Sequence, residues 1–158
     1  MNILKVVDVV DVGIDKERIR QHFYAQAAEQ FKQHPEVHTL FQQLSAWEGT
    51  HVKQFQTVRD RLVAHRPQEQ YPGEMTAYIA VLLEHHLRID DHSETLPEKF
   101  HTPIDAIDMA IAFEKEAILL FMELLPYVQE GDKSAIQTLM AEERQHVVHL
   151  VGLRQRVS

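Results

Sequence analysis

Two Glu-x-x-His pairs and two single glutamates stand out in this 158-residue sequence, because they interrupt otherwise apolar helical stripes. Residues three apart on a helix share one face, so the glutamate and histidine of a pair can reach the same ion. Each half of the chain supplies one single glutamate followed by one pair. The six residues are Glu17, Glu48, His51, Glu114, Glu143 and His146.

Four carboxylates at interior positions need compensating cations. Burying an unpaired carboxylate costs several kcal/mol, and neighbouring like charges repel one another. No Lys or Arg is found on the same stripes, so we expect no internal salt bridges there. Two divalent metal ions would balance four carboxylates, with neutral imidazoles completing the ligand sets. The alternative, a bundle with coincidental polar positions, is disfavoured by the same desolvation cost.

The absence of cysteine limits the kinds of metal site that the chain can form. It excludes disulfides, thiolate nucleophiles, iron–sulfur clusters and Cys-type zinc sites. Oxygen and imidazole ligands suit iron or manganese, although zinc binds such ligands more tightly. We predict two iron ions as cofactors, with manganese or zinc as alternatives.

The positioning elements are predicted to be helices of one domain. Helix formers are plentiful, and only 5 Gly and 6 Pro interrupt them, which predicts an all-α four-helix bundle. Two helical hairpins, about 5–65 and 103–156, should be joined by a crossover at 66–102 with a short extra helix from Thr76 to Ile89. The first helix should begin within residues 2–9 and end near Gln33; the second should run from Pro35 to about His65.

In the second hairpin, Thr102 should cap a helix that reaches about Glu130 before Gly131 ends it, although Pro126 should kink or terminate it early. Asp132 should cap the last helix. Inward stripes follow steps of three and four residues, as in near-parallel helix packing. The stripe predicted for the first helix is Val7, Val10, Ile14, Glu17, Gln21, Tyr24, Ala28 and Phe31. The stripe predicted for the third is Ile107, Ile111, Glu114, Ile118, Phe121, Leu125 and Val128.

Other residues near the six are assigned supporting or outer roles. Tyr24 could donate a hydrogen bond to a ligand carboxylate or take part in electron transfer, and Gln21 could orient a ligand. Trp47 should pack beside the site. We place Glu116, Glu142 and His149 on outer faces. A second metal site at Glu84, His85, His86, His92 and His101 is a weaker alternative to solvated side chains.

Charge and hydropathy limit the partners. The formal net charge of −8 disfavours nucleic acid, and no Lys/Arg run could neutralise several phosphates. The opening MNILKVVDVVDVG has apolar runs too short to span a membrane and no small-residue cleavage site. We therefore expect a cytoplasmic protein without membrane or nucleic-acid partners.

Five short segments of the sequence are characteristic of one protein family. They are Ile14-Asp-Lys-Glu17, Phe23-Tyr24, Ala46-Trp-Glu48-Gly-Thr-His51, Phe113-Glu114-Lys-Glu116-Ala117 and Ala141-Glu-Glu143-Arg-Gln-His146. With them, the sequence resembles the rubrerythrin branch of the ferritin-like di-iron carboxylate superfamily over nearly its whole length. The resemblance implies di-iron chemistry with O₂ or H₂O₂, often in dimers, with Glu17 and Glu114 as terminal or bridging ligands.

Two departures point to a rubredoxin-lacking relative. The cysteines of a rubredoxin-type domain are missing, so electrons must come from an external donor protein. Ala117 stands where rubrerythrins carry an additional carboxylate. We expect a homodimer that oxidises Fe(II) or reduces O₂ or H₂O₂. The alternatives are iron binding or sequestration without turnover, a di-manganese catalase-like enzyme, and an interaction scaffold.

Overall fold

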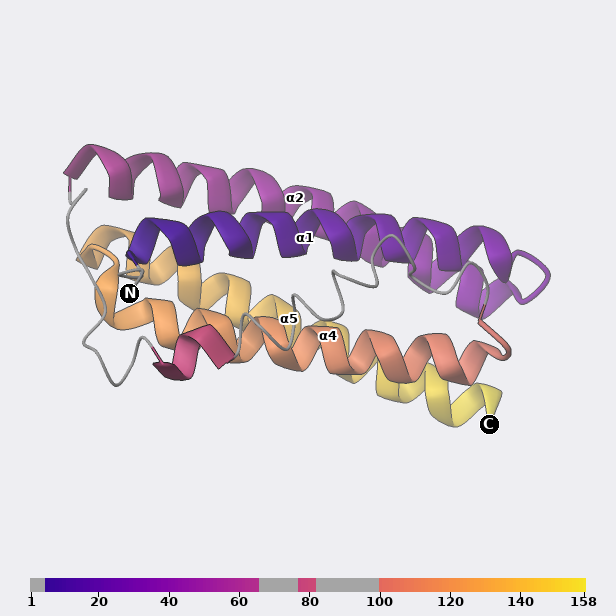
Figure 1. Ribbon diagram of the computed structural model, residues 1–158. Helices are drawn as coiled ribbons and strands as arrows, with labels where there is room; N and C mark the ends of the chain where they lie inside the picture. Colours follow the sequence, from indigo (N-terminus) through magenta and orange to yellow (C-terminus); the bar gives the residue numbers. More distant parts are fainter. Residues whose placement is uncertain (1–4, 66–76, 82–99) are drawn as a thin grey trace.

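The computed structural model describes residues 5–65, 77–81 and 100–158, which are almost entirely helical. The helices form two antiparallel hairpins; α1 and α5 run in one direction, and α2 and α4 in the other (Figure 1). This confirms the predicted all-α four-helix bundle. Within the described ranges, no helix has the length and apolarity to cross a bilayer. The elements are α1 (Val6–Gln30), α2 (Pro35–His65), α4 (Pro103–Leu124), the 3₁₀ turn η2 (Leu125–Tyr127) and α5 (Glu130–Val157).

Two of the predicted boundaries follow from local chemistry, and a third differs slightly. Pro35 is the first residue of α2, where its missing N–H costs nothing. The Thr102 hydroxyl accepts a hydrogen bond from the Asp105 amide at 3.2 Å, and the Asp105 carboxylate accepts one from the Thr102 amide at 3.0 Å, which forms a capping box. α1 ends at Gln30, slightly before the predicted Gln33.

The turn between α4 and α5 differs from the prediction. α4 ends at Leu124, before the predicted Glu130, because Pro126 has no N–H with which to continue the helical ladder. The chain tightens into η2 instead. α5 then begins at Glu130, so Gly131 and Asp132 lie in its first turn. The early end at Pro126 is confirmed, whereas the predicted helix stop at Gly131 and cap at Asp132 are wrong.

The buried stripe of α4 also differs from the predicted one. Ile111, Ile118 and Leu125 are only partly buried. Both stripes alternate in steps of three and four residues, but in the structure the step of three comes first after Ile107, which places the small side chains of Ala110 and Ala117 at the helix interface. The prediction chose the larger aliphatic residue, Ile111 or Ile118, at these turns. The seam buried in the structure is Ile107, Ala110, Glu114, Ala117, Phe121 and Leu124.

The hydrophobic core is divided into two clusters along the bundle axis. The first contains α1 residues from Val6 to Ile14 and α2 residues from Val52 to Leu62, and it also includes Ile79. The second contains α1 residues from Phe23 to Phe31 and α2 residues from Val37 to Leu44. A layer of buried polar side chains lies between them. The rest of the predicted crossover, 66–76 and 82–99, lies outside the described residues.

Candidate metal centre

The structure brings all six predicted ligands together in the polar layer. They form two overlapping groups, and within each group the candidate ligand atoms lie within 4.8 Å of one another. The four glutamates are fully buried, and the two histidines are at most 3% exposed. Position 1 denotes Glu17, Glu48, His51 and Glu143; position 2 denotes Glu48, Glu114, Glu143 and His146.

The two groups share the glutamates of the Glu-x-x-His pairs. Because Glu48 and Glu143 belong to both positions, each can offer one oxygen to either ion. The single glutamates each belong to one group, Glu17 to position 1 and Glu114 to position 2. The pattern of two glutamates and two Glu-x-x-His pairs is that of ferritin-like di-metal carboxylate bundles.

Both histidines turn the same ring nitrogen toward the carboxylates. Nδ1 of His51 lies 3.0 Å from Glu143 Oε1 and 3.4 Å from Glu48 Oε2. Nδ1 of His146 lies 2.8 Å from Glu143 Oε2 and 3.3 Å from Glu48 Oε1. Nδ1 is therefore the nitrogen that each ring would offer to an ion.

The donor set fits two divalent ions. Five glutamate oxygens of the cluster are buried without a hydrogen-bond partner in the described part of the chain. Buried carboxylate oxygens are normally satisfied, so their number indicates a missing partner. Three carboxylates and one imidazole at each position suit iron, manganese or zinc. The oxygens without partners are Glu17 Oε2, Glu48 Oε1 and Oε2, Glu114 Oε2 and Glu143 Oε2.

Without a metal, the cluster holds extra protons. Burial raises the pKa values of Glu17 and Glu114 well above the usual range. Burial alone would also raise the pKa of Glu143, but the two histidines beside it lower this pKa to about 2. Burial alone would lower the pKa of His146, but the surrounding carboxylates raise it to about 11. A metal ion would therefore have to displace protons from ligands at neutral pH.

A buried cation in direct contact with the ligands was missed by the sequence analysis. Arg20 is 2% exposed, its Nη2 donates to Glu17, and its Nε lies 3.7 Å from Glu48 Oε2. Arg20 lies beside the predicted stripe and not on it, and the expectation of no internal salt bridge among the ligands is therefore wrong. The available signal was spacing, because Arg20 follows Glu17 by one helical turn and shares its face.

Tyr24 and Gln21 have different surroundings from each other. The fully buried Tyr24 hydroxyl donates to the Glu114 carboxylate, as one of the predictions for it stated. The side-chain amide of Gln21 lies instead beside Gly49 of α2, where an added Cβ would come within 2.7 Å of its Nε2. Arg20, and not Gln21, is the polar neighbour of the ligands on this part of α1.

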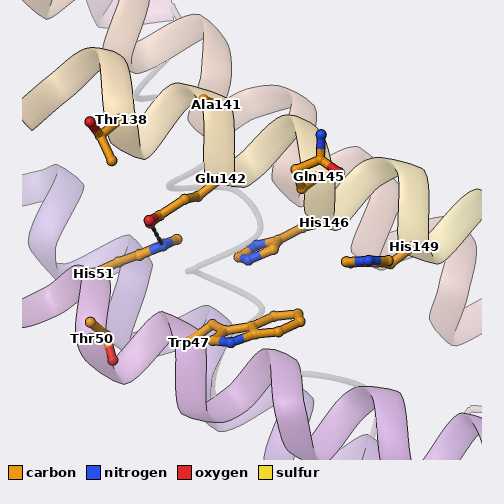
Figure 2. Close-up of a pocket in the computed structure, with 9 residues that line it drawn as sticks. All are labelled: Trp47, Thr50, His51, Thr138, Ala141, Glu142, Gln145, His146 and His149. Atoms are coloured by element: carbon orange, nitrogen blue, oxygen red, sulfur yellow. Dashed lines mark hydrogen bonds and ion pairs between the residues drawn. The ribbon is translucent and has the colours of Figure 1, made fainter. Parts of the chain in front are cut away.

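The residues that precede the two Glu-x-x-His pairs contact the opposite histidines. Glu142 precedes Glu143, and its Oε2 accepts a hydrogen bond from Nε2 of His51 at 2.8 Å (Figure 2). Its side chain is 44% exposed, in agreement with the predicted outer face, but the contact with His51 was not predicted. Trp47 precedes Glu48, and its ring stacks on His146 at 5.1 Å between centroids, as expected for packing beside the site.

A pocket of about 440 Å³ opens beside this outer edge of the cluster. Its walls come from α2 and α5 (Figure 2). It gives a small molecule access to the edges of both ligand histidines. The lining residues are Trp47, Thr50, His51, Thr138, Ala141, Glu142, Gln145, His146 and His149.

The remaining candidates do not join the cluster. His149 is exposed and stacks on Trp47 at 5.8 Å between ring centroids. His101 is exposed at the start of α4. The other members of the alternative metal site, at positions 84–92, lie outside the described residues, so that alternative stays a prediction.

Comparisons with known proteins agree with this geometry. Neither protein-family models nor curated protein sequences gave a match. Among solved structures, the chain is similar to a crystal structure from Thermotoga maritima described as a ferritin-like diiron-carboxylate protein. The TM-score is 0.77 and the sequence identity 22%, and the alignment covers 100% of this chain and 99% of the other. The chain therefore has the ferritin-like fold that its sequence predicted.

Proposed function

We propose that the chain is a di-iron protein of the rubrerythrin and ferritin-like type that oxidises Fe(II) or reduces O₂ or H₂O₂. The main support is the set of five buried glutamate oxygens without hydrogen-bond partners, arranged as two overlapping ligand groups. The similarity to a structure described as a diiron-carboxylate protein agrees with this choice of metal. A homodimer and an external electron-donor protein belong to the proposal.

The chain's own residues would hold and orient the ions. Glu48 and Glu143 would be shared, Glu17 and Glu114 would be terminal ligands, and the histidines would bind through Nδ1. Tyr24 would fix the Glu114 carboxylate through its hydrogen bond. Bound iron would supply the redox chemistry, since Fe(II) can give electrons to the oxidant and become Fe(III).

The contact of His51 with Glu142 has two consequences. Because Glu142 accepts the proton on Nε2, it favours the tautomer whose Nδ1 lone pair faces position 1. The Glu142 side chain is also 44% exposed, so it links a ligand ring to solvent. Reduction of H₂O₂ to water consumes protons, and this edge of the pocket is where they could enter.

Metal analysis and rapid mixing test the proposal together. Protein loaded with Fe(II) without oxygen should hold two iron ions per chain and should oxidise them on mixing with O₂ or H₂O₂. Glu48→Gln should abolish both properties, because it removes a shared ligand. Glu130→Gln is the matched control, since Glu130 is 89% exposed in the first turn of α5. A chain that binds no iron after such loading would contradict the proposal.

Iron binding without turnover is the second candidate, and Ala117 favours it. This residue is buried one turn after Glu114, where the resembling family carries a further carboxylate. Steady consumption of peroxide with a reductant would support the enzyme. A single oxidation of stored Fe(II) would support sequestration, and oxygen release from peroxide without reductant would indicate di-manganese catalase chemistry.

A further inference from the structure

Arg20 places a permanent positive charge inside the candidate metal centre. A guanidinium stays protonated under all ordinary conditions, and this one is nearly inaccessible to water. Its Nε and Nη1 are buried without a hydrogen-bond partner in the described part of the chain. Four carboxylates and two divalent ions would already balance, so Arg20 is one positive charge in excess.

The charge lies against Glu17 of position 1, although Arg20 Nε also lies 3.7 Å from Oε2 of Glu48, which both positions share. Arg20 lies one turn after Glu17, whereas the residue one turn after Glu114 is Ala117, and both are buried. The two terminal glutamates therefore have different protein partners. Glu17 is held in an ion pair with Arg20, and Glu114 accepts a neutral hydrogen bond from Tyr24.

An ion at position 1 meets two obstacles, and the first of them is absent at position 2, where Tyr24 and not a cation binds the terminal glutamate. It must share Glu17 with a guanidinium that already binds this carboxylate. It must also lie close to a like charge in a dry interior. At an effective dielectric constant of about 20, a unit positive charge a few Å from a divalent ion should lower the binding constant of that ion by more than about tenfold.

Glu142 has the opposite effect to Arg20 on cation binding at position 1, but its effect is weaker. Its carboxylate contacts His51, so it favours a cation at position 1. However, it reaches the site only through the imidazole ring, and its side chain is 44% exposed, so solvent screens it. Arg20 contacts the ligand carboxylate directly from a buried position, and its effect is the larger.

We propose that Arg20 makes the two metal positions unequal, so that position 2 fills first and position 1 binds a divalent ion later and more weakly. This rests on the proposed metal-binding function and adds an order of loading to it. Arg20 is here a residue that sets the affinity of position 1, acting through Glu17.

Calorimetric titration with Zn²⁺ of protein stripped of metal tests the proposal without redox chemistry. The natural chain should show two binding steps, the second at least about tenfold weaker than the first. Arg20→Gln removes the charge and should tighten the second step by about tenfold, leaving the first nearly unchanged. Arg20→Lys keeps the charge and should retain two unequal steps.

Arg18→Gln is the matched control, because it makes the same charge change on the same helix. Arg18 is exposed and pairs with Asp15 at 3.2 Å, so both binding steps should keep their natural constants. If Arg20→Gln instead kept the natural ratio of the two constants while remaining folded by circular dichroism, the proposal would be overturned.

Crystals of the natural chain grown with one equivalent of Zn²⁺ give a test that needs no variant. Anomalous scattering should appear between Glu114 and His146. A first peak between Glu17 and His51, or two equal steps in the titration, would overturn the order of loading while leaving the metal centre intact. No saturable binding at all would instead contradict the proposed function itself.

Discussion

Glu142 of α5 accepts a hydrogen bond from Nε2 of His51 on α2, across the outer edge of the candidate metal centre. The contact joins the two hairpins, because α2 belongs to one and α5 to the other. It also fixes the ring so that Nδ1 faces the glutamates. A residue outside the predicted ligand set therefore determines how one ligand is presented.

Glu142→Gln should weaken metal binding at position 1 by about tenfold, because loss of a charged partner of a ligating histidine lowers ligand basicity. Zn²⁺ titration should show the second step weakened and the first retained. Glu130→Gln removes an exposed charge from the same helix and should change neither step. Equal weakening by both variants would show that only overall charge matters.

Metal affinity and metal-free stability should have opposite pH dependences. The pKa of His146 is raised from 6.5 to about 11 by its carboxylate neighbours, although burial opposes this. Because the folded pKa is the higher one, this group's stabilisation is complete below pH 6.5 and is lost as the pH rises through about 11. Zn²⁺ affinity should instead rise with pH, by about tenfold per unit for each proton displaced.

Thermal unfolding checks the predicted sign for metal-free stability. Thermal unfolding of chelator-treated protein between pH 7 and 10 should give a melting temperature that falls as the pH rises. His146→Gln should flatten that profile, whereas His101→Gln, at an exposed position, should leave it unchanged. A melting temperature that rises over the same interval would refute the assignment.

Trp47 should report occupancy of position 2 by its fluorescence. It is the chain's single tryptophan, and its ring stacks on His146 with planes 8° apart. Co²⁺, with unpaired d electrons, should quench it strongly when bound to that histidine, and Zn²⁺ should quench it much less. If position 2 fills first, quenching should be complete after the first equivalent of Co²⁺; a change confined to the second would contradict that order.

Gly13→Ala should destabilise the bundle, although alanine favours helix. An added Cβ at Gly13 would lie 2.2 Å from Cε1 of Phe55, and that ring is fully buried edge-to-face against Phe121 at 5.2 Å. Overpacking of this kind costs about 1–3 kcal/mol. Gly152→Ala is the control, because its nearest neighbour is the flexible Arg156 at 3.4 Å, and it should stabilise by up to about 1 kcal/mol. Denaturant unfolding that ranks Gly13→Ala as the more stable variant would show that Phe55 repacks freely.

The fold was predictable where one residue type dominates the local chemistry. Pro35 and the Thr102 cap fix two helix starts, and the regular apolar stripes fix the bundle. The end of α4 was less predictable because Pro126 and Gly131 both signal a break, and the structure shows that the chain turns at the proline.

The candidate site was predictable where a polar residue interrupts an apolar stripe. The burial of Arg20 could not be predicted in this way, because arginine is usually exposed. Only the structure shows that Arg20 is buried and paired with Glu17. Glu142 lies one residue off the stripe, so its contact with His51 depends on how the hairpins approach one another. Both residues act through ligands, and spacing along one helix cannot show that.

The division of the core into two hydrophobic clusters gives the bundle an unusual weak point. Helices normally fray at their ends, where contacts are fewest, and amides near the middle exchange slowest with solvent. Here a chelated sample would have its least cohesive layer at mid-length, so local opening could start between two well-packed halves. Bound ions would then link all four helices at this layer and suppress the local opening from which hydrogen exchange would otherwise begin.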